Sequence, residues 1–232
     1  MSFESLFAEW KSTYGITAFI KDGIVDPSRY EKPHVLFVLR DMNCSRENDL
    51  RQDLQRDGSG WKTWNNIGRW TKALLDGCSE YPKDMSTSNR VDQLVRIAVM
   101  NLKKQGGTNR TPGDELKKAV EKQHDLISRE ISLCSPDIII CCGLPMTGCP
   151  SNADLLFRHV FSNHSDWEKF PSPNLPTSWW FYHAEIEGRS VPVISFCHPQ
   201  ATNFCGCRGH DGLFIPLYQD MLYIRERFLL GK

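Results

Sequence analysis

Four short apolar runs, each followed by polar residues or glycine, constrain the fold of this chain most strongly. They consist mainly of β-branched and aliphatic residues and cover residues 35–39, 97–100, 138–142 and 193–197. Parallel strands that are buried on both faces of a sheet have this composition, and ligands bind beyond their carboxyl ends. Because the runs alternate with helical patterns, we predict an α/β fold, a three-layer α/β/α sandwich with a central, mostly parallel four-stranded sheet.

Apolar residues recur at helical spacing between and around these runs. The expected helices cover about residues 3–13, 61–75, 88–95, 114–134, 151–162 and 212–228. A long polar loop is expected from the first strand to Gly60, and Glu187-Gly188-Arg189 predicts a hairpin turn that leads into the last strand.

Length and composition suit one domain. The chain has 232 residues, 40% of them hydrophobic, so a single core over residues 1–232 is expected, in a monomer. No run approaches the roughly 18 consecutive apolar residues of a membrane span. The first five residues also lack the basic and then apolar character of a signal peptide. These features predict a cytoplasmic protein that does not bind membranes.

The nine cysteines are odd in number and scattered, and several lie inside predicted strands, which favours reduced thiols over disulfides. The spacing of two cysteines and a histidine also allows a metal site. Cys205, Cys207 and His210 could supply part of a zinc site, with Cys44 or Cys149 as the fourth ligand. The preferred interpretation is a glycine-rich loop that carries thiols and binds no metal.

The ends of the predicted strands carry side chains that can do chemistry. Asp41 and Asn43 follow the first run, Asn101 directly follows the second run, and His198 follows the fourth run. A carboxylate accepts protons, a carboxamide offers a donor and an acceptor, and a histidine can donate near neutral pH. Because the carboxyl ends of parallel strands meet at one edge of a sheet, these residues are expected to form one site.

In order and spacing, these strand ends resemble the motifs of the uracil-DNA glycosylase superfamily, most closely its mismatch-specific and single-strand-selective branches. Asp41-Met42-Asn43-Cys44-Ser45 is similar to the first family motif, Gly-Ile/Met-Asn-Pro-Gly, and His198-Pro199-Gln200 is similar to the family's His-Pro-Ser. Asn101 stands where family members have a base-reading asparagine. The resemblance covers most of residues 34–228. The chain departs from it at Asp41, Cys44 and Ser45, where those branches have glycine, proline and glycine.

The resemblance implies a monofunctional DNA glycosylase that flips a base out of DNA and hydrolyses its N-glycosidic bond. Asn43 would orient the attacking water, with Asp41 as the alternative base, because an amide is a poor general base. His198 would donate to a carbonyl of the departing, anionic base. No lysine lies between Asp41 and Ser45, which favours attack by water over a Schiff-base mechanism. The reaction needs neither a metal nor an organic cofactor.

The expected base pocket contains Asn101, Ser45 and an aromatic cap. The cap would be Trp61 or Trp64, which lie after the first motif, although core packing of an amphipathic helix is the favoured explanation of both tryptophans. The uracil-specific branch blocks the pyrimidine C5 position with a tyrosine where this chain has Ser45. The resemblance therefore implies room for a C5 substituent, so that uracil or a C5-modified pyrimidine would fit.

DNA is the partner that the resemblance implies, although the net charge of zero gives no support for it. Lys103 and Lys104 follow directly on Asn101 and could contact phosphates. Asn203 or Phe204 would replace the wedge residue of the family. Excision of the base would serve base-excision repair or defence against modified phage DNA. The alternatives are a catalytically inactive nucleic-acid-binding module and a nucleotide-binding α/β enzyme, and the lack of a glycine-rich loop after the first strand disfavours the latter.

Overall fold

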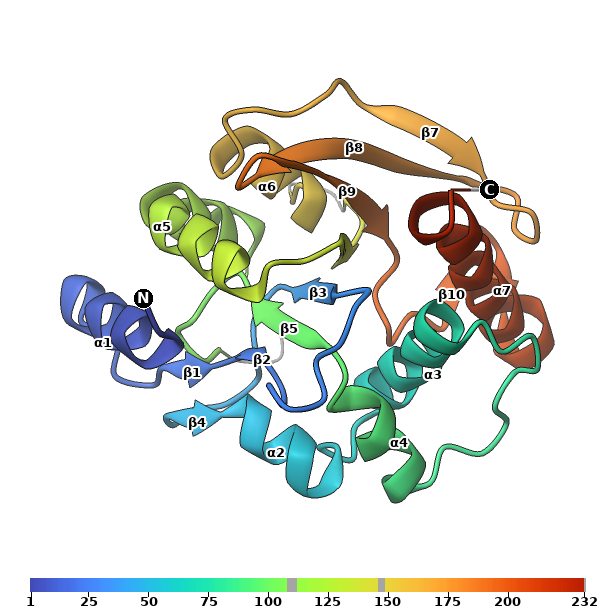
Figure 1. Cartoon of the computed structure of the whole chain (residues 1–232), viewed down its shortest axis with the longest axis horizontal. Helices are drawn as coiled ribbons and strands as arrows, with labels where there is room; N and C mark the ends of the chain where they lie inside the picture. The colour runs from blue at the N-terminus through green and yellow to red at the C-terminus, as the bar shows by residue number, and fades with distance from the viewer. Residues whose placement is uncertain (108–111, 146–148, 232) are drawn as a thin grey trace.

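The computed structural model describes residues 1–107, 112–145 and 149–231. Seven strands form the main sheet, in the spatial order β2-β5-β3-β6-β9-β8-β7 (Figure 1). Their bounds are Gly23–Ile24 (β2), Val35–Leu39 (β3), Ala98–Asn101 (β5), Ile138–Cys142 (β6), Glu168–Pro171 (β7), Ser178–Ile186 (β8) and Arg189–Phe196 (β9).

The four central strands, β5, β3, β6 and β9, are parallel to one another. They are the four runs of the sequence, and the register pairs Leu39 with Asn101 and Cys142 with Phe196. The carboxyl ends of these strands therefore meet at one edge of the sheet, as predicted. This order also places β3, the first of them in the chain, between β5 and β6.

The prediction of a four-stranded sheet is wrong, because three antiparallel strands extend it at both ends. β2 pairs with β5, β8 with β9, and β7 with β8. The hairpin at Glu187-Gly188-Arg189 forms as expected, and its first arm is β8 of the same sheet. β2 has only two residues and β7 ends on Pro171, so neither carries the long apolar pattern by which a buried strand is found in a sequence.

The helices lie close to the predicted ranges. They are Phe3–Tyr14 (α1), Leu50–Asp57 (α2), Lys62–Asp76 (α3), Thr87–Leu94 (α4), Gly113–Cys134 (α5), Asn152–His159 (α6) and Ile215–Ile224 (α7), with π-helical turns at His210–Phe214 (η1) and Arg225–Leu229 (η2) that lengthen α7 at both ends. Helix α2 occupies part of the expected polar loop. Only Leu50 and Leu54 of α2 are buried, one turn apart, and Asp49 caps its first turn.

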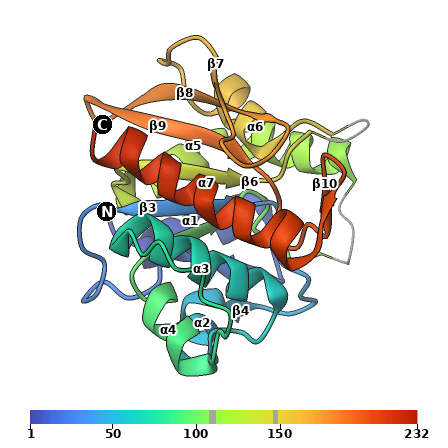
Figure 2. The same cartoon turned by 90° about the vertical axis from the view of Figure 1, so that its right-hand side faces the viewer.

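Two separate hydrophobic cores cover the two faces of the sheet. Successive residues of a strand point to opposite faces, and in β3 Phe37 belongs to one core while Leu36 belongs to the other. Trp70 of α3 lies in the core of Phe37, whereas Trp10 of α1 lies in that of Leu36. Figure 2 shows α3 and α7 side by side on one side of the sheet. The predicted α/β class is therefore confirmed.

Short strand pairs lie outside the main sheet. Ile20–Lys21 (β1) pairs in parallel with Asn48–Asp49 (β4), and Asn203–Phe204 (β10) forms a hairpin with Cys207–Arg208 (β11). Within the described parts of the chain, no helix is both long enough and apolar enough to cross a membrane.

Candidate active site

The carboxyl ends of β3, β6 and β9 place three predicted segments along one edge of the sheet. β3 leads into Arg40 and Asp41, β6 into Gly143, and β9 into Cys197 and His198. Neighbouring strands lie about 4.8 Å apart, so the ends of β3 and β9, on either side of β6, are about 10 Å apart. These strand ends define the candidate site.

Gly143 lies between these two ends and adds no side chain to the space. Its φ of +140° is a conformation that other residues rarely adopt. A Cβ atom at this position would lie 3.2 Å from Nδ2 of Asn152 and 3.4 Å from Nε of Arg40. Buried Asn152, the first residue of α6, ties the strand ends together, because its Nδ2 donates to the carbonyl of Cys142 at 2.7 Å and to that of Val38 at 3.4 Å.

Local hydrogen bonds set the tautomer of His198. The backbone N–H of Gln200 donates to Nδ1 of His198 over 3.1 Å. In a neutral imidazole one nitrogen accepts and the other carries the proton, so Nε2 of His198 is the donor. Asn66 of α3 anchors this loop, because its Nδ2 donates to the carbonyl of Pro199 at 2.5 Å.

The surroundings of His198 also favour its uncharged form. Displacement of water by the neighbouring protein atoms, and after it the positive charge of Arg40, lowers the pKa of His198. The side chain is nevertheless partly exposed and can reach a ligand. At neutral pH the ring is therefore a neutral donor through Nε2. Arg40 carries no sequence signal for a role here, since its proximity to His198 depends on the pairing of β3, β6 and β9.

The loop after β3 packs against the chain that follows β5. The backbone N–H of Gly107 donates to the carbonyl of Met42 at 2.9 Å, and Asn43 forms an isolated bridge with Gly107. A Cβ atom on Gly106 would lie 2.1 Å from the carbonyl oxygen of Cys44, so only glycine fits there. The backbone of this motif is thus held in place.

The side chains of this loop remain accessible. Asn43 and Ser45 are exposed, and Asp41 is half-buried. The loop leaves the end of β3, one strand away from Gly143 and two strands away from His198. The loop that carries Asp41, Asn43 and Ser45 therefore leaves the same edge of the sheet as the segment of His198.

Asn101 ends β5, next to the end of β3, and is almost fully buried, with 2% of its surface exposed. Its backbone N–H and its Nδ2 both donate to Oδ2 of Asp22, at 2.7 Å and 3.0 Å. Asp22 precedes β2 and is completely buried. The orientation of the Asn101 amide is therefore set by a residue that sequence analysis did not single out.

Lys104 lies in the interior and not at a surface that DNA could reach. It is fully buried, and its ammonium contacts Oδ1 of Asp22 and lies 2.7 Å from Oε2 of Glu130. Burial alone would lower the pKa of Lys104, but the two carboxylates outweigh burial and raise it. The predicted phosphate contact is thus replaced by a structural ion cluster, whose partners are 82 and 26 residues away in the sequence.

Lys103 is also mostly buried, with 8% exposed, and its ammonium lies 2.5 Å from Oε1 of Glu115 in α5. A contact with a DNA phosphate would require this ion pair to open.

The hairpin β10–β11 carries the two predicted wedge residues. Asn203 is exposed, whereas the ring of Phe204 stacks on buried Trp179 with 5.3 Å between the ring centres. Asn203 is therefore the wedge candidate that faces solvent.

The two tryptophans of the predicted cap have different environments. Trp64 is 6% exposed and belongs to the core beneath α3, so its core-packing interpretation is the one that fits. Trp61 is 64% exposed at the start of α3. It lines a cleft of about 470 Å³ formed by Asp53, Arg56, Asp57, Ser59, Gly60, Trp61, Thr87 and Arg90.

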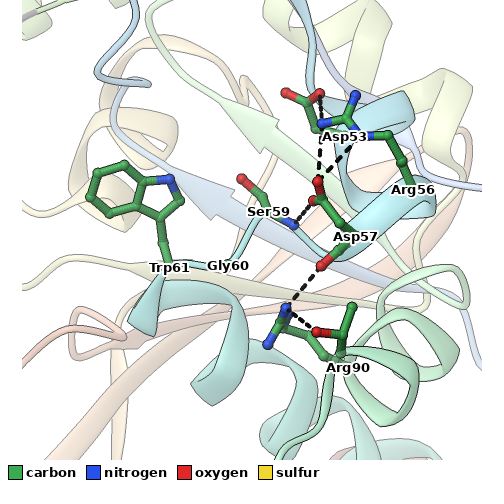
Figure 3. A pocket seen from close by; sticks show the side chains of 8 residues that line it. Asp53, Arg56, Asp57, Ser59, Gly60, Trp61 and Arg90 are labelled. Atoms are coloured by element: carbon green, nitrogen blue, oxygen red, sulfur yellow. Dashed lines mark hydrogen bonds and ion pairs between the residues drawn. The ribbon is translucent and has the colours of Figure 1, made fainter.

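The lining of this cleft includes none of the residues at the ends of β3, β6 and β9. It lies among α2, α3 and α4, and Figure 3 shows Trp61 at one end and the ion pairs of Arg56 with Asp53 and Asp57 at the other. The guanidinium of Arg90 is already occupied by the carbonyls of Gly58 and Asp57. Trp61 is the one residue of the predicted site that lines the described cleft.

No group of three or more histidine, cysteine or acidic side chains is arranged to hold a metal ion among residues 1–107, 112–145 and 149–231. Cys205 is exposed, and Nδ1 of His210 lies 2.7 Å from Oδ1 of Asp211. Cys142 and Cys197 are buried near the strand ends, and burial raises the pKa of both thiols well above the usual value.

Comparison of the chain with models of known protein families, with curated protein sequences and with solved structures gave no match. Any assignment of function must therefore come from the residues and geometry of the strand-end site.

Proposed function

We propose that this protein is a monofunctional DNA glycosylase that flips a pyrimidine, uracil or a C5-modified base, out of DNA and hydrolyses its N-glycosidic bond. The observation that carries the proposal is His198 at the end of β9. It is held with Nδ1 as acceptor and Nε2 as donor, and it lies two strands from the Asp41–Asn43 loop. The proposal includes membership of the uracil-DNA glycosylase superfamily, with its three-layer α/β/α arrangement.

In the proposed reaction, water attacks C1′ of the sugar and the C1′–N bond breaks, with its electron pair leaving on the base. Negative charge then develops on the base carbonyl, and the Nε2–H of His198 stabilises it by a hydrogen bond. A neutral donor suits this task because its hydrogen bond strengthens as the base becomes anionic. The proton lost by the attacking water passes to Asp41 or to solvent, and the base leaves as an anion that takes up a proton from solvent.

Asp41 and Asn43 would both act on the attacking water. The amide carbonyl of exposed Asn43 can orient the water, whereas Asp41 is the stronger base of the two. No metal or organic cofactor takes part in this scheme, and its product is DNA with an abasic site.

Local charge supports a DNA partner where the net charge does not. Three exposed basic residues follow predicted site residues: Arg46 comes after Ser45, Lys62 after Trp61, and Arg208 lies in the hairpin of Asn203. Such side chains would bind phosphates and position the duplex or single strand. In this proposal the protein acts as a cytoplasmic monomer in base-excision repair or in defence against modified phage DNA.

We expect purified protein to create alkali-labile sites in DNA without added metal. The test uses single- and double-stranded oligonucleotides that each carry one uracil, hypoxanthine or C5-modified cytosine, with unmodified DNA as the control. Cleavage after alkali is measured with and without a chelator.

Failure to release any base, combined with intact DNA binding, would replace the enzyme by a catalytically inactive nucleic-acid-binding module. Loss of activity on chelation, together with bound zinc, would instead point to the Cys205, Cys207 and His210 loop.

Ser45→Tyr should selectively slow the release of bases with bulky C5 groups. Ser45 is exposed, so a tyrosine can be added without disturbing the core, and its ring would narrow the space near C5. We expect a loss of at least about tenfold for a C5-enlarged pyrimidine and a smaller loss for uracil, measured with saturating enzyme. Ser45→Ala is the matched control. Equal losses on both substrates would show that Ser45 does not face C5.

A further inference from the structure

A buried carboxylate determines which end of the Asn101 amide faces the candidate site. Oδ2 of Asp22 accepts from both the backbone N–H and the Nδ2 of Asn101. Its other oxygen, Oδ1, contacts the ammonium of Lys104. Oδ2 already accepts the backbone N–H of Asn101 and Oδ1 faces an ammonium, so both oxygens of Asp22 act as acceptors and the Asn101 group that faces Oδ2 is its NH₂ group.

The surrounding cluster prevents this amide from turning over. Asp22, Lys104 and Glu130 are completely buried, and Lys104 also lies over the ring of Trp10, 5.2 Å from its centre. A reversed amide would direct its Oδ1 at Oδ2 of Asp22, so that two acceptors would face each other without a proton between them. Leaving buried acceptors unpaired is strongly unfavourable, and the observed orientation is therefore fixed.

The opposite end of the amide carries the acceptor Oδ1. Oδ1 of Asn101 has no hydrogen-bond donor among the residues that the structure describes. Asn101 pairs with Leu39 at the end of β3, directly before the loop of Arg40 to Ser45. A base bound at this edge would therefore meet a carbonyl acceptor from Asn101.

We propose that Asp22 makes Asn101 an acceptor-only reader, so that the site selects 4-aminopyrimidines, that is cytosine and its C5-substituted forms, over 4-oxopyrimidines such as uracil. The inference rests on the proposed function, because it requires a base to enter the site. The 4-amino group donates to Oδ1, whereas the 4-oxo group would place its lone pairs against the same oxygen. Asn101 is here a specificity residue, and Asp22 is a positioning residue.

The test compares bases that share the same C5 group but differ in the substituent at C4 and in whether N3 carries a hydrogen. 5-Hydroxymethylcytosine and 5-hydroxymethyluracil carry the same C5 group, and each is placed in the same oligonucleotide. We expect the wild-type protein to release the cytosine form about 10- to 100-fold faster in single turnover. Binding is measured separately with 2′-fluoro versions of both nucleotides, whose glycosidic bonds resist cleavage, and the same preference is expected in affinity.

Two variants connect this preference to the named residues. Asn101→Ala removes the reader, and the rate ratio between the two bases should fall to within about threefold. Asp22→Asn supplies an NH₂ group that can donate to Oδ1 of Asn101, which allows the amide to turn and should shift the ratio towards the uracil form. Loss of structure would lower both rates together and leave the ratio unchanged, and Asn101→Ala alone decides the question if Asp22→Asn does not fold.

Release of bases with a preference for the uracil form, or a preference that persists in Asn101→Ala, would overturn this inference and leave the proposed function intact. Release of no base at all would count against the proposed function, and the affinities for the two 2′-fluoro nucleotides would then decide the inference. Equal affinities would overturn it as well.

Discussion

Replacing Lys104 by methionine should lower the free energy of unfolding by about 3–5 kcal/mol. Methionine has a similar length but no charge, and it would leave the carboxyl groups of Asp22 and Glu130 buried without their cation. Burial already raises the pKa of Glu130 well above its usual range, even though Lys104 opposes that shift. Removal of the ammonium therefore leaves two acidic groups in an apolar interior, and Asp22, the partner of the Asn101 amide, loses its own cation.

Urea unfolding followed by circular dichroism measures this effect. Lys118→Met is the matched control, because Lys118 is exposed on α5 and lies 3.7 Å from Asp114 in a weak surface pair. The control should change the free energy of unfolding by less than about 0.5 kcal/mol. A cost for Lys104→Met as small as that of the control would mean that the cluster does not hold this corner of the fold together.

Replacing His198 by alanine should lower the single-turnover rate of base release about 100-fold, with a smaller effect on DNA binding. The expected rate loss is comparable to that for removal of one donor from an oxyanion site. The reason is that the proposed hydrogen bond from Nε2 strengthens only as the base acquires negative charge. Rates at saturating enzyme and binding to a 2′-fluoro substrate separate the two effects.

Two further variants sharpen the test. A glutamine at position 198 places an amide NH₂ group near the position of Nε2, so His198→Gln should retain more activity than His198→Ala. His124 is an exposed histidine on α5, outside the candidate site, and His124→Ala should leave the rate unchanged. An unaltered rate in folded His198→Ala would remove this residue from the mechanism.

The main parallel strands and most helices could be predicted because their signals are local. A strand buried on both faces must be apolar along its whole length, and an amphipathic helix repeats its apolar residues every turn, whatever lies far away in the sequence. The polar residues at the strand ends follow from the same pattern, and so the edge with Asp41, Asn43 and His198 was found. Short elements such as β2 and α2 carry too few residues for such a pattern.

Local sequence patterns were enough to predict the α/β class, the four central strands and the residues at their carboxyl ends. The contacts of those residues follow from the fold. The sequence suggests that Lys104 is a surface lysine, but the fold places it beside Asp22. It also allows Trp64 to be a stacking residue, but α3 packs this side chain into the core. The tautomer of His198 depends on a turn, and the orientation of Asn101 on a carboxylate 79 residues away. Contacts between distant residues depend on chain topology, which local sequence patterns do not encode.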